Sequence, residues 1–464
     1  MNGGGQPDPD RPAGPVSVEV IPFRRALKAW FLISLQTFGG PAGQIAVMQR
    51  TLVDEQRWIG QRRFLHALNY CMLLPGPEAQ QLAIYTGWLL NGVRGGLAAG
   101  VLFVLPGMMA MLSLSVIYVA FAGTTLVEGL FLGLAPAVIA IVVQAVIRVS
   151  RRALVHPSLV ALAVAAFAAL TFFSAPFPVV ILVAGLIGWV LHRVRPTSTT
   201  GPGTPTEEGT VPLISDDQLH QEPPSPRRAA TILGIGLLAW AAPVATAALL
   251  LGTDSTLVDQ GLFFSGAALV TFGGAYAVLA YVAQQAVSVH GWLAPGEMVH
   301  GLALAETTPG PLIMVVQFVA FVGAYRAPGD LDPWTAAVLA SLLTTWVTFV
   351  PSFVFVLLGA PYVEKLRGNQ ALSAALAGIT AAVVGVIANL AVYFALHTLF
   401  STSIAVDRGP WAFEVPRLDS IELPALAVTA LACVLIFTRR WSVLRTLGVC
   451  ALVGIAVQLA LSWV

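Results

Sequence analysis

The sequence predicts an all-α polytopic membrane protein made of two inverted-topology repeats, with Gly/Pro-broken or re-entrant helices. Three observations lead to this fold class. Of the 464 residues, 57% are hydrophobic and only 10% are charged, whereas soluble domains carry about 25% charged residues. The apolar residues form long runs that polar turns separate. The same short motifs also occur twice, in the same order, along the chain.

The apolar runs are long enough to count as candidate membrane segments, because a helix needs about 20 such residues to cross the bilayer. They cover approximately 25–54, 61–91, 97–120, 124–147, 154–173 and 176–192, and then 229–252, 257–286, 297–325, 334–359, 370–398, 421–438 and 442–463. Four of them, 25–54, 61–91, 257–286 and 297–325, contain Gly or Pro near the middle.

Two polar segments divide the chain into domains. Residues 1–22 are rich in Gly and Pro and predict a disordered cytoplasmic tail. Residues 193–228 are rich in Pro, Thr and acidic residues and predict a solvated cytoplasmic linker. The first repeat is therefore expected at 23–192 and the second at 229–464.

The two repeats are aligned by motifs at a constant spacing. Thr37-Phe38-Gly39-Gly40 recurs 234 residues later as Thr271–Gly274, and Pro75-Gly76-Pro77 recurs at the same spacing as Pro309-Gly310-Pro311. Trp58 and Trp292, and His66 and His300, match at this spacing too. Further along, Pro106 matches Pro351 and Gly133 matches Gly378, both at a spacing of 245 residues. Seven apolar stretches separate equivalent points, and an odd number of crossings inverts the second copy, as in many secondary transporters.

Basic residues predict the orientation. Segments 148–152, 364–367 and 439–445 are basic and should be cytoplasmic, with the N-terminus inside. Loop 50–63 carries four arginines, yet a full crossing by the first stretch would place it outside. This conflict disappears if the four interrupted stretches are re-entrant hairpins, which leaves nine full crossings. Full crossings by all the stretches remain the alternative.

The four breaks are the predicted substrate site. Non-helical backbone at membrane depth is tolerated only where protein buries it or where it lines a watery cavity, so the breaks should meet near the midplane. A helix that starts there offers unpaired N–H groups and about half a positive charge, which suits an anion. The alternative is that Gly and Pro only kink packed helices.

The predicted substrate-binding residues are those of the breaks and the polar residues beside them: Thr37, Phe38, Gly39, Gly40, Pro75, Gly76, Pro77, Gln80, Gln81, Thr271, Gly273, Gly274, Thr307, Thr308, Pro309 and Gly310. The threonine hydroxyls and the amides of Gln80, Gln81 and Gln317 are expected to add hydrogen-bond donors.

Two carboxyl groups are candidates for coupling or gating. Glu78 lies in the first turn after Pro77, where it is either a proton site or a cap for the helix start. Glu306 lies three residues before Pro309 and is not its equivalent, because the second repeat has Leu312 at that position. The site is therefore expected to be asymmetric. His66 and His300 are expected to be buried, hydrogen-bonded histidines rather than ligands.

Other function classes find little support. A net charge of +1 argues against a nucleic-acid partner. Cys71, Cys433 and Cys450 are far apart and follow no metal or redox spacing. We therefore expect no cofactor, no metal site, no catalytic residue and no enzyme activity. A membrane-embedded enzyme and a non-transporting scaffold or sensor are the alternatives from other classes.

Several motifs together resemble one family. "TFGGPAGQIAVMQ", "RWIGQRRF", "LLPGPEAQQLAIYTGW" and "GGLAAGVLFVLPG" are similar to the chromate ion transporter family, and the second copy, "TFGGAYAVLAYV" with "TTPGPL", to its long-chain two-domain members. The resemblance implies a multi-pass protein of the bacterial inner membrane that exports chromate and gives chromate resistance. It also implies that Phe38–Pro41 and Pro75–Pro77 belong to motifs needed for transport.

The expected partners are chromate and the lipid bilayer, with sulfate, an isosteric dianion, as competitor. One position departs from the family pattern, since Leu32 stands where many members carry a basic residue. The rival functions within transport are a sulfate or other oxyanion exchanger and an electrogenic anion uniporter. The oligomeric state stays open, with a homodimer as one option.

Overall fold

The computed structural model describes residues 21–194, 225–272, 274–362, 370–409 and 411–462. These residues are almost entirely helical, which confirms the all-α prediction. The sequence did not predict the small antiparallel ribbon of β1 (Ser403–Arg408) and β2 (Trp411–Pro416). Most of the predicted tail and linker, and Gly273, lie outside the described residues.

Apart from α8, which has no counterpart in the first half, corresponding elements occur in the same order in the two halves. The first half contains α1 (Phe23–Gln36), α2 (Gly40–Gln49), a π-helical turn (Arg50–Glu55), α3 (Gln61–Cys71), α4 (Glu78–Phe121), α5 (Thr125–Ala153), α6 (Pro157–Phe173) and α7 (Phe177–Val194). The second half contains α8 (Pro226–Leu251), α9 (Thr256–Leu269), α10 (Ala275–Gln284), a π-helical turn (Gln285–Val289), α11 (Glu297–Thr307), a 3-10 turn (Leu312–Met314), α12 (Val315–Arg326), α13 (Pro333–Gly359), a 3-10 turn (Ala360–Tyr362), α15 (Gln370–Leu399), a 3-10 turn (Leu418–Ser420), α16 (Leu423–Cys433), a π-helical turn (Val434–Thr438) and α17 (Val443–Leu461).

Seven of the described helices are long and apolar enough to cross a membrane: α4, α5, α7, α8, α13 with its terminal 3-10 turn, α15 and α17. The other two of the nine predicted crossings correspond to α6 and to α16 with its π-helical turn, which are shorter than 18 residues. Helix α4 runs through two predicted stretches and bends between them, because Asn91 and Gly92 leave the helical conformation.

The first two broken stretches turn back on themselves. The side chain of Asn91, at the end of the second stretch, donates to the carbonyl oxygen of Ile21, just before α1 (2.9 Å). The guanidinium of Arg25 donates to Gln56 Oε1, at the end of the first stretch (3.2 Å). Both stretches therefore end beside the place where α1 begins, as expected for two hairpins with their breaks at the tips.

The corresponding stretches of the second half behave in the same way. Arg326, the last residue of α12, forms an ion pair of 2.7 Å with Glu297, the first residue of α11. The hydroxyl of Thr256, at the start of α9, donates to the carbonyl oxygen of Ala327 (2.8 Å). The ends of these two stretches thus lie together as well.

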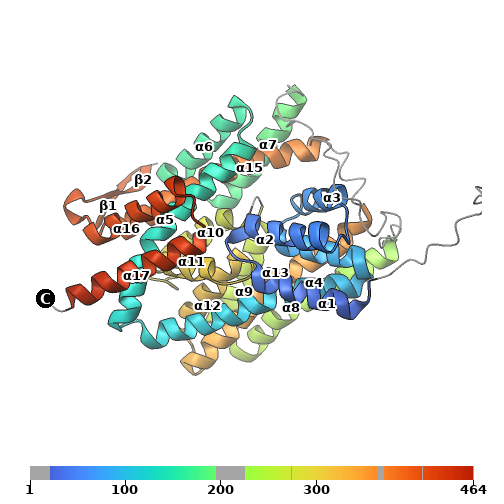
Figure 1. The fold of residues 1–464 in the computed structure, drawn as a ribbon, viewed down its shortest axis with the longest axis horizontal. Coiled ribbons are helices and arrows are strands. Elements are labelled where there is room, and N and C mark those ends of the chain that lie inside the picture. The colour runs from blue at the N-terminus through green and yellow to red at the C-terminus, as the bar shows by residue number, and fades with distance from the viewer. Residues whose placement is uncertain (1–20, 195–224, 273, 363–369, 410, 463–464) are drawn as a thin grey trace, which may run out of the picture.

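The remaining helices pack across the two halves. Helix α5 packs against α16 and α17, and its repeat counterpart α15 packs against α6 and α7 (Figure 1). The contacts are close, because a Cβ atom on Gly133 of α5 would overlap the Cys450 carbonyl oxygen, and one on Gly378 of α15 would overlap that of Ala184. These six helices form a framework beside α1–α4, α8, α9, α12 and α13 (Figure 1).

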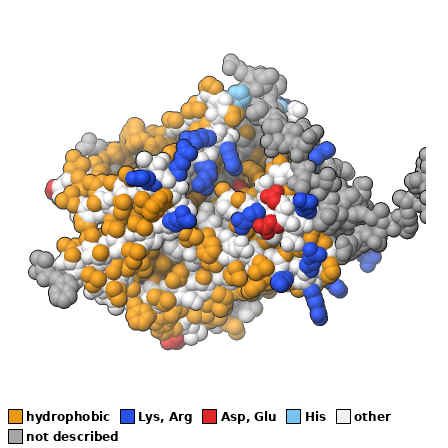
Figure 2. All heavy atoms as spheres, in the orientation of Figure 1, with side chains coloured by type: hydrophobic (Ala, Val, Ile, Leu, Met, Phe, Trp, Pro, Cys, Tyr) orange, Lys and Arg blue, Asp and Glu red, His pale blue; other side chains and the backbone are white. Residues whose placement is uncertain are grey.

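The outer surface is apolar over much of its area. Large side chains such as Leu182, Leu238 and Leu249 are more than 70% exposed, and α8 contains no buried residue. Figure 2 shows Lys and Arg side chains gathered from the upper middle to the right of one face, while hydrophobic side chains cover most of its left and lower parts. Large exposed apolar areas of this kind fit contact with lipid rather than water.

Candidate functional site

Two backbone hydrogen bonds join the breaks of the two halves. The N–H of Gly76 donates to the carbonyl oxygen of Thr271, and the N–H of Gly310 donates to the carbonyl oxygen of Thr37, both at 2.8 Å. Gly76 and Gly310 are equivalent in the repeat, and so are Thr37 and Thr271. Each hairpin tip therefore binds a tip of the other half, in a reciprocal arrangement.

Glycine is required at both of these donor positions. Gly76 has φ +122° and Gly310 has φ +97°, in the region that side chains disfavour. A Cβ on Gly76 would lie 2.7 Å from the Ser352 hydroxyl oxygen, and one on Gly310 would lie 3.2 Å from Cα of Gly107. The residues after Pro106 and Pro351, which also match in the repeat, thus close over the two tips.

Further contacts tie the tips to helices α2 and α10. The side-chain amide of Gln44, on α2, donates to the carbonyl oxygen of Gly310. A Cβ on Gly40 would lie 3.9 Å from the hydroxyl of Tyr276, on α10. The sequence-based prediction missed Gln44 and Tyr276, although each lies within one turn of a predicted helix start.

Glu306 is buried at this junction. Its side chain is 1% exposed, and its Oε1 accepts a hydrogen bond from the Tyr276 hydroxyl. Its Oε2 has no hydrogen-bond partner among the described residues. The first repeat has Met72 and Ala42 at the equivalent positions, so this pair belongs to the second half alone.

The predicted threonine donors are engaged by their own helices. The hydroxyl of Thr37 donates to the carbonyl oxygen of Ser34 (2.8 Å) and that of Thr271 to the carbonyl oxygen of Ala267 (2.7 Å). Those of Thr307 and Thr308 donate three residues back in the same way. In this conformation these hydroxyl hydrogens are not available to a ligand.

The glutamines differ from one another. The Gln81 amide donates to the carbonyl oxygen of Pro75 (2.6 Å) and so braces the tip. The Gln317 amide donates to the carbonyl oxygen of Met108 (3.1 Å), which leaves its Oε1 without a partner among the described residues. Gln80 is fully buried, and neither its Oε1 nor its Nε2 has a partner there.

The other predicted residues form the helix starts. Gly39 (φ +77°) precedes α2, which begins at Gly40, and Gly274 (φ +102°) precedes α10. Pro77 precedes α4, and Glu78 is its half-buried first residue. Phe38, Pro75 and Pro309 are partly buried within the breaks.

His300 lies in a different cluster. Its Nδ1 is 3.3 Å from the hydroxyl of Tyr118, which in turn donates to Glu297 (2.9 Å). The ring of Phe131 lies 4.3 Å from the imidazole. This setting fits the expectation of a hydrogen-bonded histidine that helps to hold the base of a hairpin.

The buried polar side chains are nearly all uncharged. Apart from tyrosines and cysteines, the buried polar side chains of the described residues are serines, threonines and glutamines, with Glu306 as the sole carboxyl group. No group of three or more His, Cys, Asp or Glu side chains in the described part of the chain is placed to hold a metal ion. The interior therefore offers hydrogen-bond donors and helix starts rather than cations.

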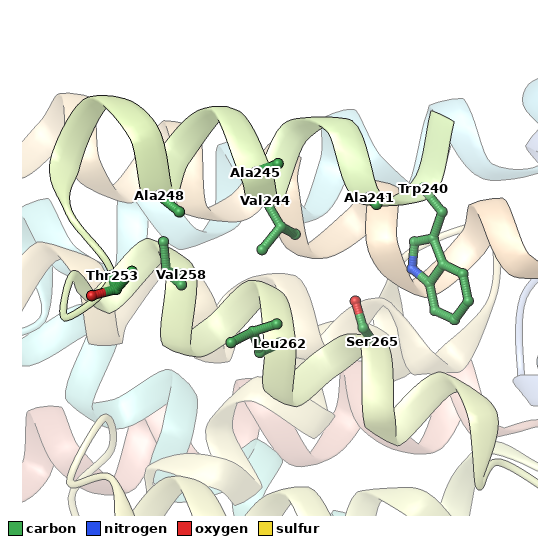
Figure 3. Close-up of a pocket in the computed structure, with 9 residues that line it drawn as sticks. All are labelled: Trp240, Ala241, Val244, Ala245, Ala248, Thr253, Val258, Leu262 and Ser265. Atoms are coloured by element: carbon green, nitrogen blue, oxygen red, sulfur yellow. The ribbon is translucent and has the colours of Figure 1, made fainter. Parts of the chain in front are cut away.

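One surface hollow has a different character. It has a volume of about 510 Å³ between α8 and α9, and apart from Thr253 and Ser265 its lining is apolar (Figure 3). Val244 and Leu262 face each other across it. An apolar hollow against an apolar outer surface suits a lipid chain and not an oxyanion.

Comparison with known proteins identifies the family. The family described as "Chromate transporter" matches residues 25–189 and 258–455, in both halves of the chain. The chain belongs to the chromate transporter family. It is 36% identical over 375 residues to a chromate transport protein of Pseudomonas aeruginosa, covering 79% of this chain and 78% of that protein.

Two further relatives agree. A chromate transport protein of Cupriavidus metallidurans is 28% identical over 86% of this chain and 90% of its own length. A probable chromate transport protein of Synechococcus elongatus is 27% identical over 78% of this chain and 82% of its own length. No solved structure matches. Family membership and the apolar helices make the chain a multi-pass membrane transporter.

Proposed function

We propose that this protein is a secondary transporter that exports chromate across the bacterial inner membrane and so gives chromate resistance. The observation that carries the proposal is the reciprocal pairing of Gly76 with Thr271 and of Gly310 with Thr37, in a chain of the chromate transporter family. It joins the four breaks in two pairs, and the approach of Gly40 to the Tyr276 hydroxyl connects the pairs at one junction. We place the anion there, between the two halves.

Electrostatics favours a dianion at this junction. Helices α2, α4, α10 and α12 with its 3-10 turn all begin at a break. Each helix start carries about half a positive charge, so four together offset about two negative charges. Glu306 and Glu78, the first residue of α4, are the carboxyl groups that oppose this charge. Sulfate has the same shape and charge as chromate and is the proposed competitor.

We further propose that residues 23–192 and 229–464 are inverted repeats. In support, hairpins, long helices and final helices follow one another in the same order in both halves, and α8 adds a single apolar helix between them. An added crossing reverses the orientation of the second half. Alternating access would then move the hairpins against the framework of α5–α7 and α15–α17.

Coupling is assigned to the carboxyl groups at the junction. Glu306 and Tyr276 are the proposed proton site, and Glu78, at the start of α4, is proposed to gate the anion. The membrane potential alone supplies about 2.3 kcal/mol per charge at 100 mV to the export of an anion from a negative-inside cell. Few coupled protons are therefore needed.

Chromate accumulation in a chromate-sensitive bacterium tests this function. Cells that express the protein should accumulate less chromate than cells with an empty vector, and a Gly76→Ala variant should lose most of the difference. Equal accumulation with and without the protein, at matched expression, would refute chromate export. A sulfate or other oxyanion exchanger, the alternative, predicts export only when the exchange anion is present outside.

A further inference from the structure

One face of α13 carries a row of hydroxyl side chains. Ser341, Thr344, Thr345, Thr348 and Ser352 are all buried, in a helix apolar enough to cross the membrane. At about 100° per residue, these five positions fall within an arc of about 100° on the helix. The row is about 16 Å long, at about 1.5 Å per residue, which is roughly half the hydrocarbon thickness of a bilayer.

The row connects the junction to α12. At one end, the Ser352 hydroxyl lies against Gly76, at the tip of the hairpin formed by α3 and α4. At the other end, the Ser341 hydroxyl donates to the carbonyl oxygen of Gln317, on α12 (3.3 Å). Helix α13 packs against both α4 and α12 along this face.

Three of these hydroxyls have no hydrogen-bond partner among the described residues: those of Thr344, Thr348 and Ser352. A buried hydroxyl in a helix usually donates to the carbonyl oxygen four residues earlier, and Thr345 does so, to Ser341 (2.8 Å). Unpartnered buried polar groups are rare and costly, so they call for a ligand or a function.

Gln80 extends this unpartnered set. It lies in the first turn of α4, next to Gln81, whose amide nitrogen lies beside Gly76 as the Ser352 hydroxyl does. Both polar atoms of the Gln80 side chain are buried and without a partner in the described part of the chain. Gln81 on α4 and Ser352 on α13 therefore flank the same hairpin tip, and Gln80 is the neighbour of Gln81 in the first turn of α4.

The chemistry of the row selects an anion. A divalent metal cation is bound mainly by carboxylate oxygens, and the buried face of α13 has only neutral hydroxyls. Hydroxyl and amide donors instead replace the water around an oxyanion, one hydrogen bond at a time. Several weak donors in a row also allow the ion to leave one position for the next.

We propose that the three unpartnered hydroxyls of α13, those of Thr344, Thr348 and Ser352, form with Gln80 a second oxyanion site along which chromate passes between the Gly76 tip and Gln317. This inference rests on the proposed transport of chromate. It adds residues that are not part of any break and that act in the permeation step. The ligand class is a tetrahedral oxyanion, and the contacts are hydrogen bonds from Thr344, Thr348 and Ser352.

Replacing Thr348 with valine tests the site, because valine keeps the shape and removes the hydroxyl. In proteoliposomes, Thr348→Val should lower kcat/KM for chromate by about tenfold or more, the factor expected for one lost hydrogen bond to a charged group. Its thermal stability should be unchanged or higher, since an unpartnered buried polar group is removed. Thr348→Ser should restore most of the transport.

Thr345→Val is the matched control, on the same face of the same helix and equally buried. The Thr345 hydroxyl already donates to the carbonyl oxygen of Ser341. Its removal should therefore lower the stability of the protein slightly and leave chromate transport within about twofold of the wild type. Ser352→Ala provides a second test, should Thr348→Val fail to fold.

The outcomes separate this inference from the proposed function. Wild-type-like transport by both Thr348→Val and Ser352→Ala, in liposomes where the wild type moves chromate, would overturn the α13 site alone. A wild type that moves no chromate would overturn the proposed function and this inference with it. Equal losses in Thr345→Val and Thr348→Val would show a packing effect and would also overturn the site.

Discussion

The substitution Gly76→Ala addresses the contact between the two halves. Gly76 has φ +122° and donates its N–H to the carbonyl oxygen of Thr271. A Cβ added to it would lie only 2.7 Å from the Ser352 hydroxyl oxygen and 2.8 Å from the Gln81 amide nitrogen. An added methyl group strains the backbone, pushes against two side chains and lengthens the hydrogen bond across the junction.

The expected cost is the sum of three effects. The backbone strain costs about 1–3 kcal/mol, and overpacking in a close-packed site costs about 1–3 kcal/mol. The hydrogen bond contributes about 0.5–1.5 kcal/mol net. Together they reach about 2.5–7.5 kcal/mol, which is a large fraction of the stability of a typical folded domain.

Two further alanine variants provide controls for this value. Gly39 also has a positive φ, +77°, but nothing lies within 4 Å of an added Cβ. In Gly39→Ala the backbone strain alone should therefore cost about 1–2 kcal/mol. Gly448→Ala lies within α17 in open space and should be neutral or slightly stabilising.

The assay is thermal unfolding of the purified protein in detergent, together with chromate transport by the same preparations. The melting temperature should be highest for Gly448→Ala, lower for Gly39→Ala and lowest for Gly76→Ala. The Gly76→Ala protein should also lose chromate transport. A Gly76→Ala protein as stable and active as Gly448→Ala would refute the close contact between the hairpin tips.

Three other predictions follow from single contacts. Glu306→Gln keeps an acceptor for Tyr276 but cannot carry a proton, so chromate flux in proteoliposomes should continue and lose its response to an imposed pH gradient; an unchanged response would remove Glu306 from coupling. Arg326→Met removes the bidentate pair with Glu297 at the base of a hairpin. Because Arg326 is 45% exposed, the pair should contribute only about 1 kcal/mol, seen as a lower melting temperature with an unchanged KM for chromate, and an unchanged melting temperature would contradict this. Gly378→Ala should lower the melting temperature by more than Arg326→Met, since its Cβ overlaps the backbone of α7, whereas equal values would argue against the close packing of α7 and α15.

The sequence predicted the broken helices well, because glycine and proline act on the backbone locally. The TFGG and PGP motifs interrupt apolar runs that would otherwise continue, and the structure places a break at each. The arginines of loop 50–63 favoured hairpins over full crossings, and the contact between Arg25 and Gln56 fits hairpins.

The sequence did not predict which residues each break contacts. The bonds from Gly76 to Thr271 and from Gly310 to Thr37 join residues far apart in the chain, and local patterns carry no signal for such pairing. The threonine hydroxyls were expected to face a ligand. The structure has them bonded to their own helices, as hydroxyls in apolar surroundings commonly are.

For the hydroxyl row on α13, the sequence shows the positions of the hydroxyl groups but not their hydrogen bonds. Its spacing is readable in the sequence from Ser341 to Ser352, but spacing does not reveal which hydroxyls lack a partner. Only the packing of α4 and α12 against α13 buries Thr344 and Thr348 without one. The ribbon at 403–416 was missed because it lies between apolar stretches, where hydropathy says little about local structure.

The most direct test of the central claim is the movement of radiolabelled chromate by the purified wild-type protein in liposomes. With a membrane potential imposed by a potassium gradient, the protein should move chromate toward the positive side, and excess sulfate should inhibit the flux. Protein-free liposomes and Gly76→Ala provide the baseline. Chromate flux no greater than this baseline, under imposed electrical, pH and sulfate gradients alike, would contradict the account.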